Sequence, residues 1–388
     1  MKIGFDVSQF GPEKAGCGNY ASLLLESIKN TEIIDYINYF NTFGDFYFDR
    51  RLSLLPINEH KLSFSNLTKN HFSKSKATDF WTKNDLQDHL LDFDIVHSNN
   101  YWCPKNIYKT KIIYTLYDLS FFINPSWTTE ENRIGCSNGV ITASSEADWI
   151  IAISDSTKKD FLDYFPHYPE ERIRIIYPYS RFKHSNVNLK NNNRFLNDKK
   201  LLNGFILSVG TIEPRKNHLF LLESYRKYLD ICQQKYPLIL AGNKGWLMDN
   251  FHAEIDRLGI SENVIITNYV ADDELSWLYS NCLLNIYPSL YEGFGLPVLE
   301  GIAHSAPTLT TDVSSMPEIL PSNECLINPY DTSQCADKIH QIVNNNIYRQ
   351  SIIDYGISRV FKFSKENCKN QLIDLYFEAI KSPKIVFK

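Results

Sequence analysis

The sequence predicts an α/β protein made of two doubly wound domains, each built on a parallel sheet. The chain has 388 residues, and single hydrophobic cores stop growing at roughly 250–300 residues. Short apolar runs alternate with stretches of helical periodicity, and this alternation begins afresh after a polar, Asn-rich stretch. We therefore predict an N-terminal domain at residues 1–180, a linker at 181–200, a second domain at 201–362, and a last segment at 363–388 whose helix returns to the first domain.

Composition excludes several classes of protein. The hydrophobic share of 43% is that of a globular chain, and the net charge of −5 argues against nucleic-acid binding. The eight cysteines include no Cys-x-x-Cys pair, which favours reduced thiols. Asp6 stands where a signal peptide needs an apolar core, and no run approaches the roughly 18 apolar residues of a membrane span. A cytoplasmic protein is predicted.

The first domain is predicted to open with a strand at 2–8 and a helix at 20–29. The loop between them, 11–19, contains Gly16 and Gly18 and has the character of a phosphate-binding turn. It lacks the full dinucleotide spacing and the Gly-Lys-Ser/Thr of a P-loop, so a flexible surface loop remains the alternative. Further strands are predicted at 94–97, 111–116, 149–154 and 172–177, and helices at 129–148 and 155–165.

The segment at 46–81 differs in composition from the rest of this domain. It mixes lysine and arginine with phenylalanine and tyrosine and has few acidic residues. A basic and aromatic surface of this kind suits anionic lipid headgroups or a lipid-linked acceptor, which would give peripheral membrane contact. The alternative is a solvated face with anchoring aromatic side chains.

In the second domain, short apolar runs predict a new set of strands with helices between them. The strands are predicted at 204–210, 237–242, 263–270, 283–287 and 307–311. The helices are predicted at 217–234, 248–258, 272–281 and 297–304, with a helical pattern continuing over 332–380. Right-handed crossovers would make this a second parallel sheet.

The stretch at 287–300 is the first candidate for chemistry. It follows a buried strand and leads through a glycine-bearing loop into a helix. Free N–H groups and the helix dipole make such a terminus an anion site. Glu292 and Glu300 flank it, and two carboxylates beside phosphate make sense mainly as acceptors for hydroxyl groups. A nucleotide-sugar fits both features, and ordinary helix capping is the alternative.

Arg215 and Lys216 form the second candidate, directly after the strand that ends at Gly210. Paired cations at the start of a helix oppose its dipole unless an anion lies nearby, so a clamp on a diphosphate is one explanation and a solvated helix start the other. Ligands of open α/β sheets bind beyond the carboxyl ends of the strands. The two candidates are therefore expected to meet in one cleft between the domains.

These residues resemble the retaining glycosyltransferases of family four, which have the two-Rossmann GT-B fold. The stretch at 208–217 is similar to the family's donor-phosphate motif, and 292–300 matches its Glu-x7-Glu signature. The order and separation of the two motifs are more specific than either alone. The resemblance extends over nearly the whole chain and is strongest from 206 to 320.

The resemblance implies a role for each matched residue. Arg215 and Lys216 would bind the donor diphosphate, Glu292 would hold hydroxyls of the donor sugar, and Glu300 would bond the ribose. Gly293, Phe294 and Gly295 would shape the donor loop, and Leu296 would offer its backbone N–H to phosphate. Gly16 and Gly18 resemble the first-domain loop that closes on the diphosphate and the acceptor, and Gly210 is a further donor-binding candidate. Ser154 and Thr157 match a family segment that is structural.

The chain departs from the family pattern at one informative place. The family often has His-Asp after the strand at 111–116, whereas this chain has Tyr117-Asp118. Asp118 remains a candidate for orienting a sugar in the reaction, and Tyr117 and His97 are candidates on the acceptor side. Ser305 also stands where a glycine is usual.

The implied function is retaining transfer of a hexose from a nucleotide-sugar to a glycan or lipid-linked acceptor in surface polysaccharide or glycoconjugate synthesis. In the family the leaving phosphate is thought to accept the acceptor's proton, so neither carboxylate is an acid or base, and no metal and no bound cofactor are expected. The form of residues 212–217 most resembles mannosyltransferases that use GDP-mannose. A sugar-nucleotide epimerase and a catalytically silent nucleotide-sugar or glycan-binding protein are the alternatives.

Overall fold

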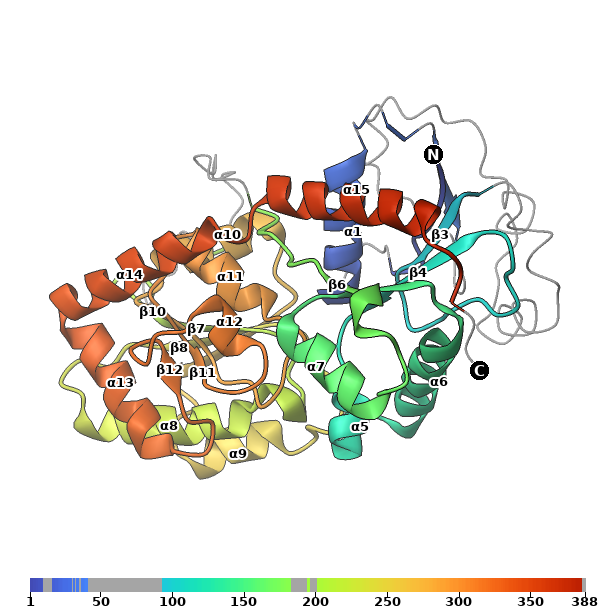
Figure 1. Ribbon diagram of the computed structural model, residues 1–388. Helices are drawn as coiled ribbons and strands as arrows, with labels where there is room; N and C mark the ends of the chain where they lie inside the picture. The colour runs from blue at the N-terminus through green and yellow to red at the C-terminus, as the bar shows by residue number, and fades with distance from the viewer. Residues whose placement is uncertain are drawn as a thin grey trace. The chain divides into compact units, whose positions relative to one another are not determined.

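The computed structural model has two compact α/β units (Figure 1). It describes residues 1–9, 16–29, 31, 33–34, 36–40, 93–182, 194–195 and 201–385. The first unit comprises Met1–Ile123, Glu130–Tyr179 and Ser364–Lys388, and the second comprises Asn124–Thr129 and Ser180–Phe363. The basic and aromatic segment at 46–81 lies outside the described residues, as does most of the predicted linker.

The first unit is built on a parallel sheet with the strand order β2-β1-β3-β4-β5-β6. Its strands are β1 (Lys2–Asp6), β2 (Tyr36–Phe40), β3 (Ile95–Ser98), β4 (Lys111–Leu116), β5 (Trp149–Ala152) and β6 (Ile173–Ile175). Five of these confirm predicted strands. Strand β2 was not predicted, although four of its five residues are tyrosine, isoleucine or phenylalanine, which favour strands.

The helices of the first unit are α1 (Gly16–Ile28), α5 (Ser120–Ile123), α6 (Glu130–Glu146), α7 (Asp155–Tyr164) and α15 (Lys365–Lys381), with a 3-10 turn at Glu170–Arg172. The predicted loop at 11–19 is wrong over its second half, because Gly16 and Gly18 belong to the first turn of α1. Tertiary burial overrides the low helix propensity of glycine here. Leu23, Leu24 and Leu25 are all buried, and they fix this segment on the sheet as a helix.

The last long helix, α15, belongs to the first unit and packs against α1, which it crosses (Figure 1). Tyr376 of α15 is fully buried and its hydroxyl lies 2.7 Å from Nδ1 of His97 on β3. Arg174 on β6 pairs with Glu378 on α15 at 2.5 Å. A helix from the end of the sequence thus completes the core formed by its beginning.

The segment after α15 is fastened to the same unit by a group of polar contacts, which we call the C-terminal clasp. Asp148 is buried. Its Oδ2 accepts a hydrogen bond from the Ile112 amide at 2.8 Å and forms an ion pair with Lys384 Nζ, also at 2.8 Å. The Ser382 hydroxyl accepts a hydrogen bond from Arg172 Nη1 at 2.8 Å, and the Ser382 carbonyl accepts one from Lys111 Nζ at 2.6 Å. A buried carboxylate with these partners is satisfied rather than costly.

The second unit repeats the architecture with a parallel sheet of order β12-β11-β10-β7-β8-β9. Its strands are β7 (Ile206–Val209), β8 (Leu238–Ala241), β9 (Val264–Asn268), β10 (Leu284–Tyr287), β11 (Thr308–Thr311) and β12 (Leu326–Ile327). The first five confirm predicted strands, whereas the two-residue β12 is too short to produce a pattern. Two parallel sheets in two α/β units confirm the predicted fold class.

The helices of the second unit are α8 (His218–Ile231), α9 (Phe251–Arg257), α10 (Asp272–Asn281), α11 (Leu296–Ala303), α12 (Met316–Ile319), α13 (Thr332–Asn344) and α14 (Asn346–Val360). Two 3-10 turns also belong to this unit, at Pro125–Trp127 and Pro214–Lys216. Trp127 comes from the first half of the sequence, yet its indole stacks on Tyr291 with ring centroids 6.2 Å apart, and its carbonyl accepts the indole N–H of Trp246 at 2.7 Å.

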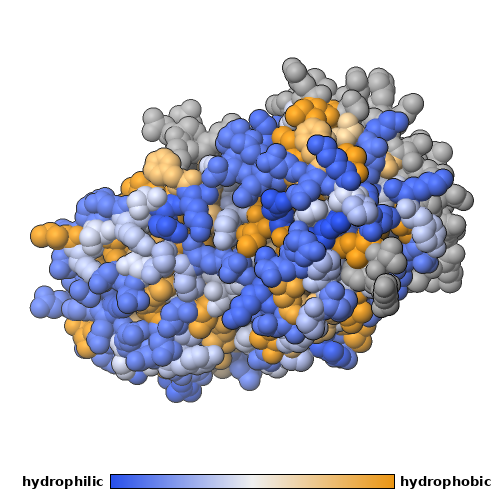
Figure 2. Space-filling model, viewed as in Figure 1, coloured by the Kyte–Doolittle hydropathy of each residue, from blue (hydrophilic) through white to orange (hydrophobic). Residues whose placement is uncertain are grey.

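The visible surface of the described residues is mainly hydrophilic, with hydrophobic side chains interspersed among polar ones (Figure 2). A folded protein always leaves some apolar side chains exposed, and scattered ones need no special explanation. Within the described part of the chain, no helix combines the length and the apolar character needed to span a bilayer.

Candidate functional site

Arg215 and Lys216 lie on a rigid turn between β7 and α8. The turn is tied to the loop after β8, because the Ile212 amide donates to the Asn243 carbonyl and the Gly245 amide donates to the Ile212 carbonyl, each at 3.0 Å. Gly242 is required for this approach, since a Cβ there would lie 2.1 Å from the Gly210 carbonyl oxygen. The backbone under the two cations is therefore fixed before any ligand arrives.

The loop after β10 presents Glu292 and is held from below by two serines. The Glu292 amide donates to Ser314 Oγ at 2.9 Å, and the Glu292 carbonyl accepts from Ser315 Oγ at 2.8 Å. Gly295 has φ of 106°, and a Cβ at this position would lie 2.4 Å from Met316 Cε, so only glycine fits. Helix α11 starts at Leu296, one residue before the predicted start at 297.

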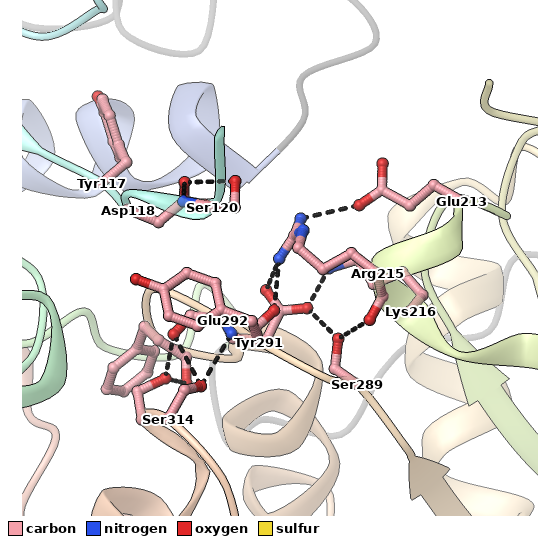
Figure 3. Close-up of polar contacts among 12 residues, drawn as sticks. Tyr117, Asp118, Ser120, Glu213, Arg215, Lys216, Ser289, Tyr291, Glu292 and Ser314 are labelled. Atoms are coloured by element: carbon pink, nitrogen blue, oxygen red, sulfur yellow. Dashed lines mark hydrogen bonds and ion pairs between the residues drawn. The ribbon is translucent and has the colours of Figure 1, made fainter. Parts of the chain in front are cut away.

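The structure brings Arg215, Lys216 and Glu292 together in one cluster (Figure 3). Glu292 Oε2 lies 2.7 Å from Arg215 Nη1, and Oε1 lies 2.5 Å from Lys216 Nζ. Oε1 also accepts hydroxyl hydrogen bonds from Tyr287 at 2.8 Å and Ser289 at 2.5 Å. Glu292 thus holds both cations in place through its two oxygens.

Glu213 completes the cluster and was not singled out from the sequence. Its carboxylate is buried and lies 2.8 Å from Arg215 Nη2, while Arg215 Nη1 also donates to the Tyr291 carbonyl at 2.8 Å. Two cations are therefore balanced by two carboxylates. Glu213 lies two residues before Arg215. This spacing belongs to no helical charge pattern, so the sequence does not reveal the pair.

Charge governs the ionisation of Glu292. Burial alone would raise its pKa, but the nearby Arg215 and Lys216 outweigh burial and hold the pKa of Glu292 at about 2. Tyr287 is neutral, because burial and the Glu292 charge raise the pKa of its phenol well above the ordinary value. The cluster is thus a set of fixed charges at neutral pH.

Glu300 is buried on α11, and its contacts are with residues outside the Arg215 cluster. Its Oε1 lies 2.9 Å from Arg181 Nε, and its Oε2 accepts the Tyr279 hydroxyl at 3.3 Å. Burial raises the pKa of Glu300 above its ordinary value, with Arg181 acting in the opposite direction. Phe294 is also buried, packed edge-on against Phe363 at 5.4 Å, so its side chain shapes the loop from inside the core.

In the first unit, His97 and Tyr117 are built into the core. Nδ1 of His97 contacts the Tyr376 hydroxyl at 2.7 Å, its Nε2 contacts Thr115 Oγ1 at 2.8 Å, and burial lowers its pKa to about 3. The Tyr117 hydroxyl donates to the Asn99 carbonyl at 2.8 Å. With both His97 nitrogens and the Tyr117 donor engaged inside the unit, we leave these two residues out of the proposed site.

Asp118 is half-buried and follows β4, with Oδ1 accepting the Ser120 amide at 3.1 Å and the Ser120 hydroxyl at 2.9 Å (Figure 3). This contact starts the short helix α5. Ser154 caps α7 by accepting the Thr157 amide at 3.0 Å, a structural role of the kind that the resemblance implied. Ser305 has φ of 60°, the left-handed conformation in which glycine is common, which accounts for the residue usual at that position.

Asp6 is a further buried carboxylate at the end of β1. It accepts the Ser8 amide at 2.9 Å, the Ser8 hydroxyl at 2.6 Å and the Asn100 side-chain amide. Burial raises the pKa of Asp6 to about 7. No sequence signal distinguishes this residue, because a strand that ends in aspartate is common. Within the described residues, no group of three or more His, Cys, Asp or Glu side chains is arranged to hold a metal ion.

Replacing Asp6 with asparagine is expected to change the pH dependence of stability. The folded pKa is about 7 against an ordinary value of 3.8, so the protonated carboxyl is favoured in the fold and its contribution is lost as pH rises from about 4 to about 7. Asp6→Asn should abolish this loss and raise the free energy of unfolding above pH 7 by roughly 2–4 kcal/mol. Urea unfolding across this pH range measures it, with exposed Asp163→Asn as control. A parallel pH profile in both variants contradicts the assignment.

Two long stretches of the chain match models of known protein families. Residues 56–179 match the model "Glycosyltransferase Family 4", and residues 190–359 match the model "Glycosyl transferases group 1". The O-antigen chain mannosyltransferase B of Escherichia coli is 28% identical over 316 residues, which cover 76% of each chain. The serotype-specific mannosyltransferase WbdA of Escherichia coli is 29% identical over 62% of this chain, which spans only 30% of that longer protein.

Solved structures agree on the fold. The HepE protein of Anabaena, determined with UDP and glucose, superposes with a TM-score of 0.71 at 17% identity over 97% of this chain and 100% of its own. WaaG, a glycosyltransferase involved in lipopolysaccharide biosynthesis, gives a TM-score of 0.70 at 16% identity over 96% of this chain and 99% of its own. The chain has the GT-B fold and belongs to the glycosyltransferases that the family-four and group-1 models describe.

Proposed function

We propose that this glycosyltransferase moves a hexose, with retention of anomeric configuration, from a nucleotide-sugar to a glycan or lipid-linked acceptor in surface polysaccharide synthesis. GDP-mannose is the favoured donor. The observation that carries the proposal is the cluster of Arg215, Lys216 and Glu292 on two fixed loops at the carboxyl ends of β7 and β10. This is the edge at which open α/β sheets bind nucleotides.

The proposed chemistry follows from the charge that the reaction develops. Breaking the bond between sugar and diphosphate leaves negative charge on the diphosphate and positive charge at the anomeric carbon. Arg215 and Lys216 would stabilise the leaving diphosphate, and because their backbone is fixed, little reorganisation is required. Two side-chain cations supply the charge that a metal would otherwise supply, so we propose a mechanism in which no metal acts.

Glu292 and Glu213 have a distinct part in this mechanism. The cations are already balanced by the two carboxylates, so a diphosphate would have to take Lys216 from Glu292 or share it. We propose that Glu292 then turns an oxygen to a hydroxyl of the donor sugar. Because the pKa of Glu292 is about 2, it acts as a hydrogen-bond acceptor and carries no proton for the reaction. The acceptor's proton would pass to the leaving phosphate.

Mannose is favoured as the donor sugar by the relatives. The Escherichia coli O-antigen chain mannosyltransferase B matches over 76% of both chains, and the O-antigen chain mannosyltransferase RfbU of Salmonella typhimurium is 29% identical over 48% of both chains. HepE, in contrast, was solved with UDP-glucose at 16% identity. A lipid-linked acceptor would bring the protein to the cytoplasmic face of a membrane as a peripheral protein, which remains a prediction.

A donor panel tests the proposal. The protein is incubated with GDP-mannose, UDP-glucose, UDP-galactose or dTDP-rhamnose, together with lipid-linked or free glycan acceptors, and nucleoside diphosphate release and product mass are measured. We expect acceptor-dependent release with GDP-mannose and an α-linked product. The one-bond coupling between C1 and H1 in the NMR spectrum identifies the anomer. If none of the four donors gives nucleoside diphosphate release, transferase activity is contradicted. A β-linked product formed from GDP-mannose contradicts retention. Conversion of the donor without any acceptor supports the epimerase alternative.

A further inference from the structure

Arg181 is the second residue of Ser180–Phe363, the main stretch of the second unit, which directly follows Tyr179 of the first unit. Its guanidinium is divided between two carboxylates of the second unit. Nε lies 2.9 Å from Glu300 Oε1 on α11, and Nη1 lies 3.1 Å from Asp272 Oδ1 at the start of α10. The guanidinium also lies over the ring of Phe182, 4.8 Å from its centroid. The side chain is only 24% exposed, so this geometry is enforced by packing.

The groups that face Glu300 come from three segments. Asp272 and Tyr279 belong to α10, Arg181 to the segment that enters the unit, and His304 to the end of α11. The Tyr279 phenol is neutral, because burial raises its pKa well above the ordinary value. His304 contacts the Glu300 backbone carbonyl through Nδ1 at 2.7 Å and Ser276 Oγ through Nε2 at 2.8 Å. Among these groups, Arg181 is the permanent cation.

We infer that Arg181 is a positioning residue for nucleotide recognition, which keeps Glu300 an ionised acceptor aimed at the ribose diol of a nucleoside diphosphate. This inference rests on the proposed function, in which Glu300 bonds the ribose. It adds a residue outside both sequence motifs. The site is thereby extended to the segment at which the chain enters the second unit.

The physical argument concerns a buried carboxylate with little else to stabilise its charge. Glu300 is 4% exposed, and burial raises its pKa, as does the nearby Asp272. Arg181 and the Tyr279 hydroxyl act in the opposite direction. Without Arg181, the carboxyl group takes up a proton at higher pH than before. A protonated carboxyl offers fewer acceptor sites, and a ribose diol has two hydroxyl hydrogens to donate.

The Phe182 ring, over which the Arg181 guanidinium lies, helps to fix the orientation of the guanidinium towards Glu300. Phe182 also packs edge-on against His304 with centroids 4.7 Å apart, and His304 stacks on Tyr279 at 5.4 Å. The guanidinium is therefore held between an aromatic layer and the carboxylate. A lysine can supply the charge at this position but neither the planar stacking nor the second donor to Asp272.

The experiment compares the wild-type chain with Arg181→Ala and Arg181→Lys. Dissociation constants are measured by calorimetry for GDP and UDP and for their 2′,3′-dideoxy analogues between about pH 5.5 and 8.5, and kcat and KM are measured for the active donor. In Arg181→Ala we expect about tenfold weaker binding of the ribonucleotide, little change for the dideoxy analogue, and an affinity that improves as pH rises. Arg181→Lys should recover part of the affinity. KM should change more than kcat.

Arg194→Ala is the matched control. Arg194 also lies over the ring of the phenylalanine that follows it, at 4.8 Å from Phe195, and also pairs with a carboxylate of α10, Glu274 at 3.4 Å. It has no contact with Glu300 among those that the structure gives. We expect Arg194→Ala to bind all four nucleotides as the wild type does.

The outcomes separate this inference from the proposed function. If the wild type binds neither GDP nor UDP, the proposed function fails and the inference fails with it. If the wild type prefers the ribonucleotide and Arg181→Ala keeps the same preference and pH profile, the function stands and the inference is wrong. Equal loss of affinity for ribo- and dideoxynucleotides would also overturn it, because that result indicates structural damage. Thermal unfolding of each variant verifies that it is folded.

Discussion

The variant Arg215→Ala is expected to lower kcat/KM for the donor by about a thousandfold. The guanidinium would contribute a charge-assisted contact to the leaving diphosphate, and this contact strengthens as negative charge develops there. Its loss also leaves Glu213 as a buried carboxylate whose partner at 2.8 Å has been removed. Nucleoside diphosphate release under saturating acceptor measures the effect. We expect kcat to fall as well, but by no more than kcat/KM, because the guanidinium would also bind the diphosphate of the donor before the reaction.

Lys244→Ala is the control for Arg215→Ala. Lys244 lies on the neighbouring loop after β8, its side chain is 59% exposed, and its ion pair at 3.4 Å is with the exposed Asp249. Removing an exposed cation should leave turnover within about twofold. Arg215→Lys keeps the charge but cannot reach Glu213, Glu292 and the Tyr291 carbonyl together, so we expect partial activity. Full transfer by Arg215→Ala would remove this residue from the site.

Replacing Glu292 with glutamine should cost activity and acid-sensitive stability together. Glutamine is nearly isosteric and still accepts from Ser289 and Tyr287, but it has no charge to balance Arg215 and Lys216. The pKa of Glu292 is about 2 against 4.5, so its contribution is present above pH 4.5 and is lost as pH falls towards 2. At pH 7 the free energy of unfolding should fall by on the order of 3 kcal/mol, and the acid-dependent loss should shrink.

Activity and stability can be separated for Glu292→Gln. Turnover is measured at a temperature where circular dichroism shows a folded variant, and we expect kcat to be lower by about a hundredfold or more. Glu223→Gln, at an exposed position of α8, is the matched control and should change neither property. An unchanged kcat in folded Glu292→Gln would show that this carboxylate serves the fold alone.

Much of the fold follows from patterns that the sequence displays openly. The buried strands β4 and β10 consist mainly of apolar residues and are bounded by turn residues, and the helix after the Glu292 loop begins with a leucine and a proline. Gly295 is required by its φ and by Met316, which makes its place in the loop a physical necessity. Such local signals predicted the two sheets and the loops on which Arg215 and Glu292 lie.

Other features depend on contacts between distant residues and leave no local signal. Arg181 reaches Glu300 across more than a hundred residues of sequence, and Glu213 is marked only by the guanidinium that it holds. His97 illustrates the converse case. A histidine at the end of a strand looks available for chemistry, yet Tyr376, far along the chain, buries and bonds it. Burial by a remote helix is beyond the reach of periodicity.

The C-terminal clasp and α15 have a consequence for biosynthesis. The ribosome makes β1 to β6 first, then Ser180–Phe363 of the second unit, and only then the helix that packs against β3 and supplies Tyr376. Domains generally fold as units while the chain emerges. The second unit is therefore able to finish folding during translation, whereas the first must wait with part of its core uncovered. Its final packing must wait until α15 has emerged from the ribosome, and a chaperone would be needed in this interval.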